Sequence, residues 1–292
     1  MDREAQSLHQ IQETFPDLVI ESVRSPQRES QYNQILILND TWVFRFPRYA
    51  HGVSAMLREN NLLGRIGTHL PLPVPDPIYT SQNTTIVGQV FSGYRLLPGE
   101  SLYPDKLAAI PQERHQPLAD QLGTFLRQLH AIPEQIHKLI EPPRDSLDEW
   151  DRMYAQIRAR LFDYMRPEAR LQVASHFETF LQELQASPYQ PCLRHGDFGG
   201  SNILYDPDRL VITGIIDFSS LALGDPAVDI AAAATLGESF VLRMSSVYPE
   251  IETMLPRARF YRGTFALQEA LAGLQDDDRA AFERGIAPYL MH

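Results

Sequence analysis

The chain has 292 residues, of which 43% are hydrophobic, 22% charged and 10% aromatic, and these proportions exclude a wholly disordered chain and a collagen-like fibre. The 26 basic and 37 acidic side chains give a formal net charge of −11. Such a charge disfavours binding to nucleic acid or to an anionic membrane and favours a cationic ligand, although solubility alone also explains it.

The first third of the chain is typical of an antiparallel sheet interrupted by a helix. Apolar residues at helical spacing predict helices over residues 2–15 and 53–66. Short apolar runs predict five strands, at residues 19–23, 32–38, 41–46, 78–80 and 85–96. Asn39-Asp40 is the expected hairpin turn, and four prolines make residues 70–77 extended.

The remainder is predicted to be mostly helical. Apolar spacing predicts helices near residues 118–129, 150–165, 177–184, 229–236 and 257–274, and a small hairpin over residues 203–217. Strands followed by helices indicate an α+β, bilobal chain. We expect an N-terminal sheet lobe over residues 1–93, a polar, glycine-bearing boundary segment over 94–100 and a larger helical C-terminal lobe over 101–292.

The most informative stretch runs from His195 to Asn202, HGDFGGSN, directly before the predicted hairpin; Asp217 follows the hairpin in the sequence IIDF. A kinase-type site needs this order of residues. One carboxylate, Asp197, orients the acceptor hydroxyl and takes its proton. The amide of Asn202 and the carboxylate of Asp217 hold Mg²⁺. Each fragment alone could be a turn or a cap, but the order and spacing make chance a poor explanation.

Together with GDPxxD at residues 224–229, these motifs resemble those of the aminoglycoside phosphotransferase family, small-molecule kinases with a protein-kinase-like fold. WVFRFP at residues 42–47 resembles the third strand of that family, Arg58-Glu59 its next helix, and residues 93–100 its hinge. The resemblance covers roughly residues 20–275. It implies a bilobal protein-kinase-like fold in which residues 1–93 bind the nucleotide, residues 94–100 are the hinge, and residues 101–292 carry the catalytic loop and the substrate site. It also implies a donor that is ATP or GTP and nucleotide contacts near Arg95 and Leu97.

Two departures from the family pattern concern the nucleotide. The third strand carries Arg45 where the family usually has lysine; the resemblance implies that this cation pairs with Glu59 and touches the phosphates. Residues 24–34 hold no glycine, so a serine-rich turn with Ser25 and Ser30 replaces the glycine-rich loop.

The acceptor is expected to be small, because only seven residues separate Asp217 from Asp225, which leaves no peptide-docking segment. For an aminoglycoside, carboxylates near the pocket supply charge-assisted hydrogen bonds, and Glu238 and Glu269 are the candidates. A macrolide, or a metabolite resembling homoserine or choline, is the alternative. Asp225, Asp229 and His195 are expected to support the catalytic loop, and Cys192 to be a buried small hydrophobe.

Two other interpretations of the whole chain stay open. A kinase-shaped nucleotide-binding module without catalysis is favoured by Arg45 and the glycine-free loop, and opposed by the intact set of Asp197, Asn202 and Asp217. A helical interaction protein with accidental motifs is the third.

The setting is expected to be cytoplasmic. Cys192 is the single cysteine, so an intrachain disulfide is excluded. Residues 1–10 do not read as a signal peptide, and the longest uncharged apolar stretch, residues 230–236, is too short to span a bilayer. We expect a monomer or weak dimer.

Overall fold

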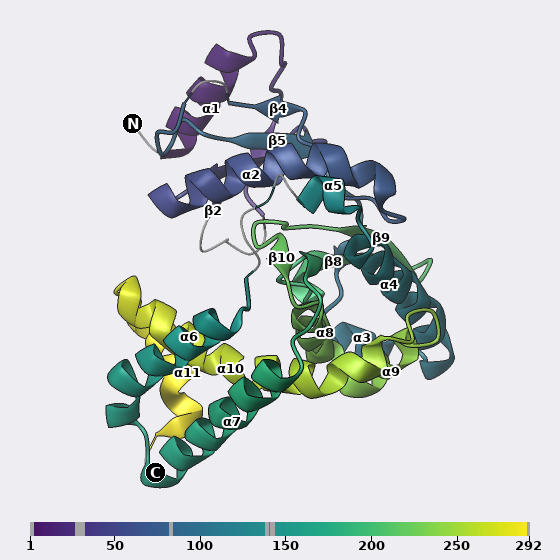
Figure 1. Ribbon diagram of the computed structural model, residues 1–292. Coiled ribbons are helices and arrows are strands. Elements are labelled where there is room, and N and C mark those ends of the chain that lie inside the picture. The colour runs from purple at the N-terminus through teal and green to yellow at the C-terminus, as the bar shows by residue number, and fades with distance from the viewer. Residues whose placement is uncertain (1–2, 27–32, 82–83, 138–139, 141–143, 291–292) are drawn as a thin grey trace. The chain divides into compact units, whose positions relative to one another are not determined.

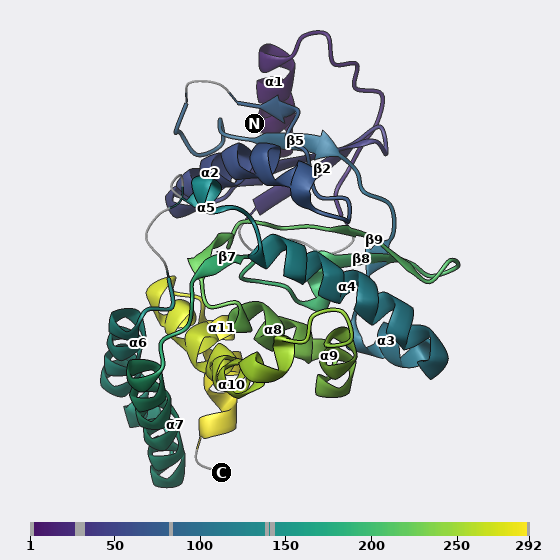
Figure 2. The ribbon, with the colours of Figure 1, turned by 45° about the vertical axis from the view of Figure 1, so that its right-hand side comes forward.

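The computed structural model describes residues 3–26, 33–81, 84–137, 140 and 144–290. It divides into two compact units: unit 1 is residues 1–129 with 200–221, and unit 2 is residues 130–199 with 222–292 (Figures 1 and 2). Residues 200–221, which begin with the last glycine of the HGDFGG motif, therefore group with the N-terminal part of the chain.

Unit 1 is built on a five-stranded antiparallel sheet with the order β1-β2-β3-β5-β4. Its strands are β1 (Val23–Arg24), β2 (Asn33–Leu38), β3 (Trp42–Pro47), β4 (Tyr79–Thr80) and β5 (Ser92–Arg95). The helices α1 (Arg3–Thr14) and α2 (Ala50–Ile66) lie on opposite faces of this sheet (Figures 1 and 2).

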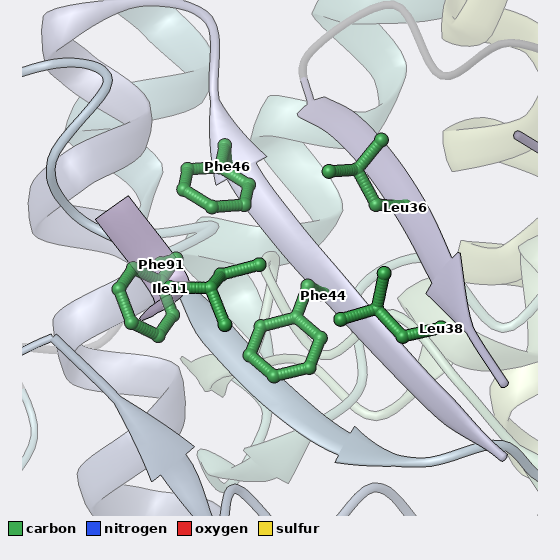
Figure 3. Packing of buried hydrophobic residues seen from close by; sticks show 6 residues of the cluster. All are labelled: Ile11, Leu36, Leu38, Phe44, Phe46 and Phe91. Atoms are coloured by element: carbon green, nitrogen blue, oxygen red, sulfur yellow. The ribbon is translucent and has the colours of Figure 1, made fainter. Parts of the chain in front are cut away.

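The face of the sheet toward α1 is the apolar core of unit 1. Ile11 from α1 packs with Phe44 and Phe46 of β3, Phe91, and Leu36 and Leu38 of β2, all of them buried (Figure 3). Because side chains alternate along a strand, Val43 and Arg45 point to the other face, toward α2. Alternation on β3 therefore places Phe44 and Phe46 on the apolar face of the sheet and the charged Arg45 on the opposite face.

A second, three-stranded sheet completes unit 1. It has the order β6-β8-β9, from β6 (Glu100–Ser101), β8 (Ile203–Asp206) and β9 (Val211–Ile215). The helices α3 (Pro104–Ala109) and α4 (His115–His130) follow β6 along the chain. The extended proline-rich segment lies against β9, since the Pro73 carbonyl accepts a hydrogen bond from Ile215 N at 2.9 Å. The hairpin predicted over residues 203–217 is confirmed.

Unit 2 is mostly helical. Its helices are α5 (Glu134–His137), α6 (Leu147–Arg160), α7 (Pro167–Ala186), α8 (Ala227–Ala233), α9 (Glu238–Met244), α10 (Ile251–Gln275) and α11 (Arg279–Ile286). A capping box formed by Ser146 and Glu149 begins α6, and a proline in its first turn begins α7. The strands β7 (Cys192–Arg194) and β10 (Ala222–Gly224) pair antiparallel, and β7 leads directly into the HGDFGG motif. The expected α+β class is confirmed.

Several predicted boundaries differ from the observed ones, and a physical reason is clear for three of them. The strand predicted over 19–23 shrinks to β1, because the Asn39 side chain bonds the backbone of Val19, Glu21 and Ser22 in place of a ladder. A turn with Gly88 at φ 87° interrupts the strand predicted over 85–96. The helix predicted over 257–274 is α10; it begins six residues earlier than predicted and holds Pro256 inside it.

The Asn39-Asp40 turn forms as expected. Both residues have the positive φ values, 52° and 47°, that a tight hairpin turn requires. No helix in the described part of the chain is long and apolar enough to cross a membrane.

Candidate active site

A cluster of three charged side chains, two of them buried, lies in unit 1. The Arg45 guanidinium donates from Nη1 to Glu59 Oε1 at 2.8 Å and from Nη2 to Asp217 Oδ1 at 3.1 Å. Arg45 and Glu59 are only 4% and 3% exposed, whereas the Asp217 side chain is 38% exposed. The Arg45–Glu59 pair was predicted; the contact with Asp217 was not.

Each member of the cluster comes from a different element. Arg45 lies on β3, Glu59 on α2, and Asp217 two residues after the end of β9. Glu59 Oε1 also accepts a hydrogen bond from Phe218 N at 3.3 Å, so α2 holds the Asp217-Phe218 segment by its backbone as well. Asp217 has a φ of 61°, a left-handed conformation that costs a non-glycine residue about 1 kcal/mol and needs such anchoring.

Burial and charge oppose each other in this cluster. Burial disfavours the charged guanidinium, but the carboxylates of Glu59 and Asp217 outweigh it and raise the pKa of Arg45, which therefore stays cationic. Burial raises the pKa of Glu59, and the guanidinium only partly offsets this. Glu59 Oε2 is buried and has no hydrogen-bond partner among the described residues. Burial also raises the pKa of nearby Tyr94 to about 12, so its phenol is neutral.

Asn202 lies at the same end of the β8–β9 hairpin as Asp217. It closes a short 3₁₀ turn, Gly200–Asn202, and its carbonyl accepts from Ile216 N at 2.9 Å. Amide and carboxylate oxygens are the ligands that Mg²⁺ prefers, and Mg²⁺ is commonly held by one or two protein groups together with substrate phosphates. The donor set fits that cation, and the described residues contain no cluster of three His, Cys, Asp or Glu that would indicate another metal site.

In unit 2, Asp197 lies on the loop after β7. Asp197 is exposed while its neighbour His195 is wholly buried, and Asp197 N donates to His195 Nδ1 at 3.2 Å. A carboxylate presented on a loop whose other residues are fixed is suited to orient a hydroxyl group and accept its proton.

The backbone of that loop is fixed by a wholly buried carboxylate, Asp229 on α8. Its Oδ2 accepts from His195 N at 2.8 Å and its Oδ1 from Gly196 N at 2.7 Å, and Oδ2 lies 3.1 Å from His130 Nε2. Burial opposes its charge, but these bonds and the nearby histidines outweigh burial and lower the pKa of Asp229. His130 in turn lies 3.0 Å from the Tyr248 hydroxyl.

Asp225 is also wholly buried and has a capping role. It accepts from Ala227 N in the first turn of α8, from Arg257 Nε at 2.6 Å and from the Tyr261 hydroxyl at 2.8 Å. The expectation that Asp225 and Asp229 support the loop and the helix is confirmed. The sequence analysis did not predict their side-chain partners, which are His130 on α4 and Arg257 and Tyr261 on α10. The one sequence feature that could have indicated such a partner is a histidine, His130, at the end of an apolar helix.

The other residues predicted for the nucleotide lie at the end of β5. Arg95 is exposed, with its guanidinium 5.1 Å from the centre of the Trp42 ring. Leu97 follows two residues later and covers Gly214 on β9, where a Cβ atom would lie 2.8 Å from Leu97 Cδ1. Ser30 lies outside the described residues.

The two acidic residues predicted for the acceptor lie on the surface of unit 2, and each has an arginine partner. Glu238 pairs with Arg259, and Glu269 lies 2.9 Å from Arg284 Nε. Each arginine neutralises the negative charge of the carboxylate with which it pairs. Cys192 is largely covered, and burial raises the pKa of its thiol, as expected for a small hydrophobe.

Comparison with known proteins gives one consistent result. Residues 27–275 match the model of a family described as the phosphotransferase enzyme family. The chain is 30% identical over 198 residues to viomycin phosphotransferase of Streptomyces vinaceus, covering 66% of this chain and 67% of that protein.

Solved structures agree over nearly the full length. A complex of APH(2")-IIIa with GDP and kanamycin is 26% identical and superposes with a TM-score of 0.88, covering 96% of both chains. A macrolide 2'-phosphotransferase of Brachybacterium faecium, 20% identical, has a TM-score of 0.71 over 94% of both chains, and this likeness shows the fold alone. The kinase-like fold expected from the motifs is thereby confirmed.

Proposed function

The chain belongs to the phosphotransferase enzyme family, and we propose that it transfers the γ-phosphoryl group of ATP or GTP to a hydroxyl group of an aminoglycoside-like small molecule. The observation that carries the proposal is the Arg45–Glu59–Asp217 cluster, in which a buried cation contacts two carboxylates. Phosphoryl transfer needs a fixed cation for the phosphates and oxygen ligands for the metal. Arg45, held by two carboxylates, offers the first, and Asp217 and Asn202 at one end of the β8–β9 hairpin offer the second.

Unit 1 supplies the nucleotide side of the proposed reaction. Glu59 fixes Arg45 so that its charge is available to phosphate oxygens without reorganisation. Asn202 and Asp217 would hold Mg²⁺, which neutralises charge on the phosphates when it is bound. In the hinge segment, contacts near Arg95 and Leu97 are proposed for the base, and Ser30 for a phosphate.

Unit 2 supplies the acceptor side. Asp197 accepts a hydrogen bond from the acceptor hydroxyl, orients it and takes its proton. The new P–O bond to the acceptor forms as the bond from the γ-phosphorus to the bridging oxygen breaks, and the nucleoside diphosphate leaves with that oxygen. The neighbouring backbone does not move, because Asp229 holds the N–H groups of His195 and Gly196. Positioning of this kind supplies a large part of the rate enhancement in phosphoryl transfer, which demands little covalent chemistry from the protein.

An acceptor bearing amino groups is favoured over a neutral one by two observations. The net charge is −11, and the relatives named above include an enzyme whose structure contains kanamycin. Glu238 and Glu269 are proposed as acceptor contacts, on the condition that the cationic ligand displaces their arginine partners. Glu238→Gln and Glu269→Gln should then raise KM for the acceptor and leave kcat within about threefold.

The test is a panel assay. Purified protein is incubated with Mg²⁺ and either ATP or GTP, and with kanamycin, viomycin, a macrolide, homoserine or choline as the acceptor. Phosphorylated product is detected by mass spectrometry. Product with an aminoglycoside supports the proposal, product only with another acceptor reassigns the substrate class, and no product with any acceptor, despite nucleotide binding, favours the non-catalytic module.

Asp197→Ala is the matched inactive control. It should reduce turnover by about 10²–10⁴-fold, the usual effect of losing a general base, while nucleotide affinity changes little because Asp197 acts on the acceptor. Isothermal titration with nucleotide checks the second half of this expectation. Wild-type turnover in this variant would remove Asp197 from the mechanism.

A further inference from the structure

The guanidinium of Arg45 contacts two carboxylates at once, and they differ in environment. Glu59 is buried and belongs to α2, whereas the Asp217 side chain is 38% exposed. The Glu59 contact is the shorter, at 2.8 Å against 3.1 Å for Asp217. The pair with Glu59 is therefore the fixed one, and the pair with Asp217 can be exchanged.

Asp217 is also the carboxylate proposed to bind the metal. An oxygen that already accepts a hydrogen bond from a guanidinium is a weaker ligand, and a divalent cation beside that guanidinium meets a like charge at close range. Nucleotide phosphates offer Arg45 other oxygen partners, and guanidinium groups bind phosphate well.

We propose that Arg45 is the counter-ion of Asp217 as long as no nucleotide is bound. Asp217 becomes free to bind the metal only when nucleotide phosphates replace it as the partner of Arg45 Nη2. This inference rests on the proposed function, since it assumes that Asp217 is the metal ligand. Metal and nucleotide then bind cooperatively, in addition to their direct contact. The nucleotide draws Arg45 away from Asp217, which frees Asp217 for the metal, and the metal on Asp217 frees Arg45 for the phosphates. Arg45 is in this respect a positioning residue as well as a phosphate ligand.

The sharpest variant replaces both members of the fixed pair, Arg45→Gln with Glu59→Gln. It changes the net charge by zero, removes no metal ligand and leaves no buried ion without its partner. Asp217 loses its counter-ion. The affinity for Mn²⁺ in the absence of nucleotide should therefore rise, by about fivefold or more if the coupling is of ordinary size for two linked sites.

The readout is binding, not activity. Free Mn²⁺ is counted by electron paramagnetic resonance as protein is titrated, with and without a nonhydrolysable ATP analogue. A residue with a merely structural role would lower metal affinity when replaced, so the sign of the change is diagnostic. In the double variant the analogue should also increase Mn²⁺ affinity less than it does in the wild type.

Two controls separate the possible causes. Arg48→Gln removes a positive charge one residue beyond the end of β3, where Arg48 Nε donates to the Asn33 carbonyl, and should leave Mn²⁺ affinity without nucleotide unchanged. Asp217→Asn should abolish the site in every background. Arg45→Gln alone is the second variant, for use if the double variant does not fold, and its expected change has the same sign.

The outcomes are distinct. Tighter Mn²⁺ binding in the double variant, dependent on Asp217, supports the proposal. Asp217-dependent binding that is equal or weaker in the double variant, or that needs the analogue in both proteins, overturns it and leaves the proposed function standing. Mn²⁺ binding that does not depend on Asp217 in any protein, even with the analogue, overturns the metal assignment itself.

Discussion

Replacing Asp229 by asparagine should disturb the loop that carries Asp197, the residue proposed to orient the acceptor, without changing a residue proposed to contact either substrate. The carboxylate is wholly buried and accepts from two backbone N–H groups, at 2.8 and 2.7 Å, with His130 Nε2 at 3.1 Å. Asparagine keeps the shape but offers a single acceptor oxygen. One backbone N–H group of the loop then faces an NH₂ group.

The magnitude follows from these contacts. A hydrogen bond to a charged group contributes about 1.5–3 kcal/mol and a neutral one about 0.5–1.5, so each retained bond weakens by roughly 1 kcal/mol. The N–H group left without an acceptor costs a further 1–3 kcal/mol or so. The free energy of unfolding should therefore fall by about 3–5 kcal/mol, the range seen when one member of a buried ion pair is removed.

The assay is urea unfolding at pH 7, with Asp276→Asn as the control, since it removes the same charge from an exposed turn. We expect the control to stay within about 0.5 kcal/mol of the wild type. Turnover of Asp229→Asn should fall while nucleotide affinity stays near normal, because the anchored loop carries Asp197. Equal unfolding curves for the two variants would refute the reasoning.

The same carboxylate predicts a pH dependence. The pKa of Asp229 is lower in the folded than in the unfolded chain, so the stability that it contributes is fully present above its unfolded pKa of about 3.9 and is lost as the pH falls toward the folded pKa. The difference in unfolding free energy between wild type and Asp229→Asn should be constant from about pH 5 to 7 and shrink below about pH 4. A difference that grew on acidification would contradict the sign of the shift.

Arg45→Lys should retain much of the transfer activity, because the charge that Glu59 anchors is kept, whereas Arg45→Met should lose far more. Initial rates at saturating nucleotide measure both variants, and equal rates for Arg45→Met and wild type would show that Arg45 has no role in transfer. Gly224→Ala should destabilise the protein by about 1–3 kcal/mol, because the new Cβ would lie 2.3 Å from Asp145 Oδ2 and 2.7 Å from Arg194 Nε and would disrupt their ion pair. Gly64→Ala is its control in thermal unfolding: nothing lies within 4 Å of that Cβ, and a helical glycine replaced by alanine should stabilise by up to about 1 kcal/mol.

Several elements of the fold were predictable because each depends on local sequence. The Asn39-Asp40 turn, the hairpin over residues 203–217 and the helix periods involve neighbours within a few residues, and turn chemistry or apolar spacing shows directly in the sequence. The same holds for strand alternation on β3, which put Arg45 opposite Phe44 and Phe46. One wrong prediction, the strand over residues 19–23, failed because a side chain from a distant turn took part: Asn39 bonds the backbone of residues 19–22.

The sequence by itself therefore determined the chemistry: which carboxylates, amide and cation the chain offers, in what order, and on what kind of element. Only the tertiary structure decided how these groups share partners. Arg45 and Asp217 are 172 residues apart, and the bond between them exists because β3, α2 and the end of β9 pack in one unit. Likewise Asp229 reaches back 34 residues to the backbone of His195, with His130 of α4 beside it. A pattern in the sequence reports propensities over a few residues, whereas the partner of a buried charge is set by the packing of distant segments, and no local period encodes that choice.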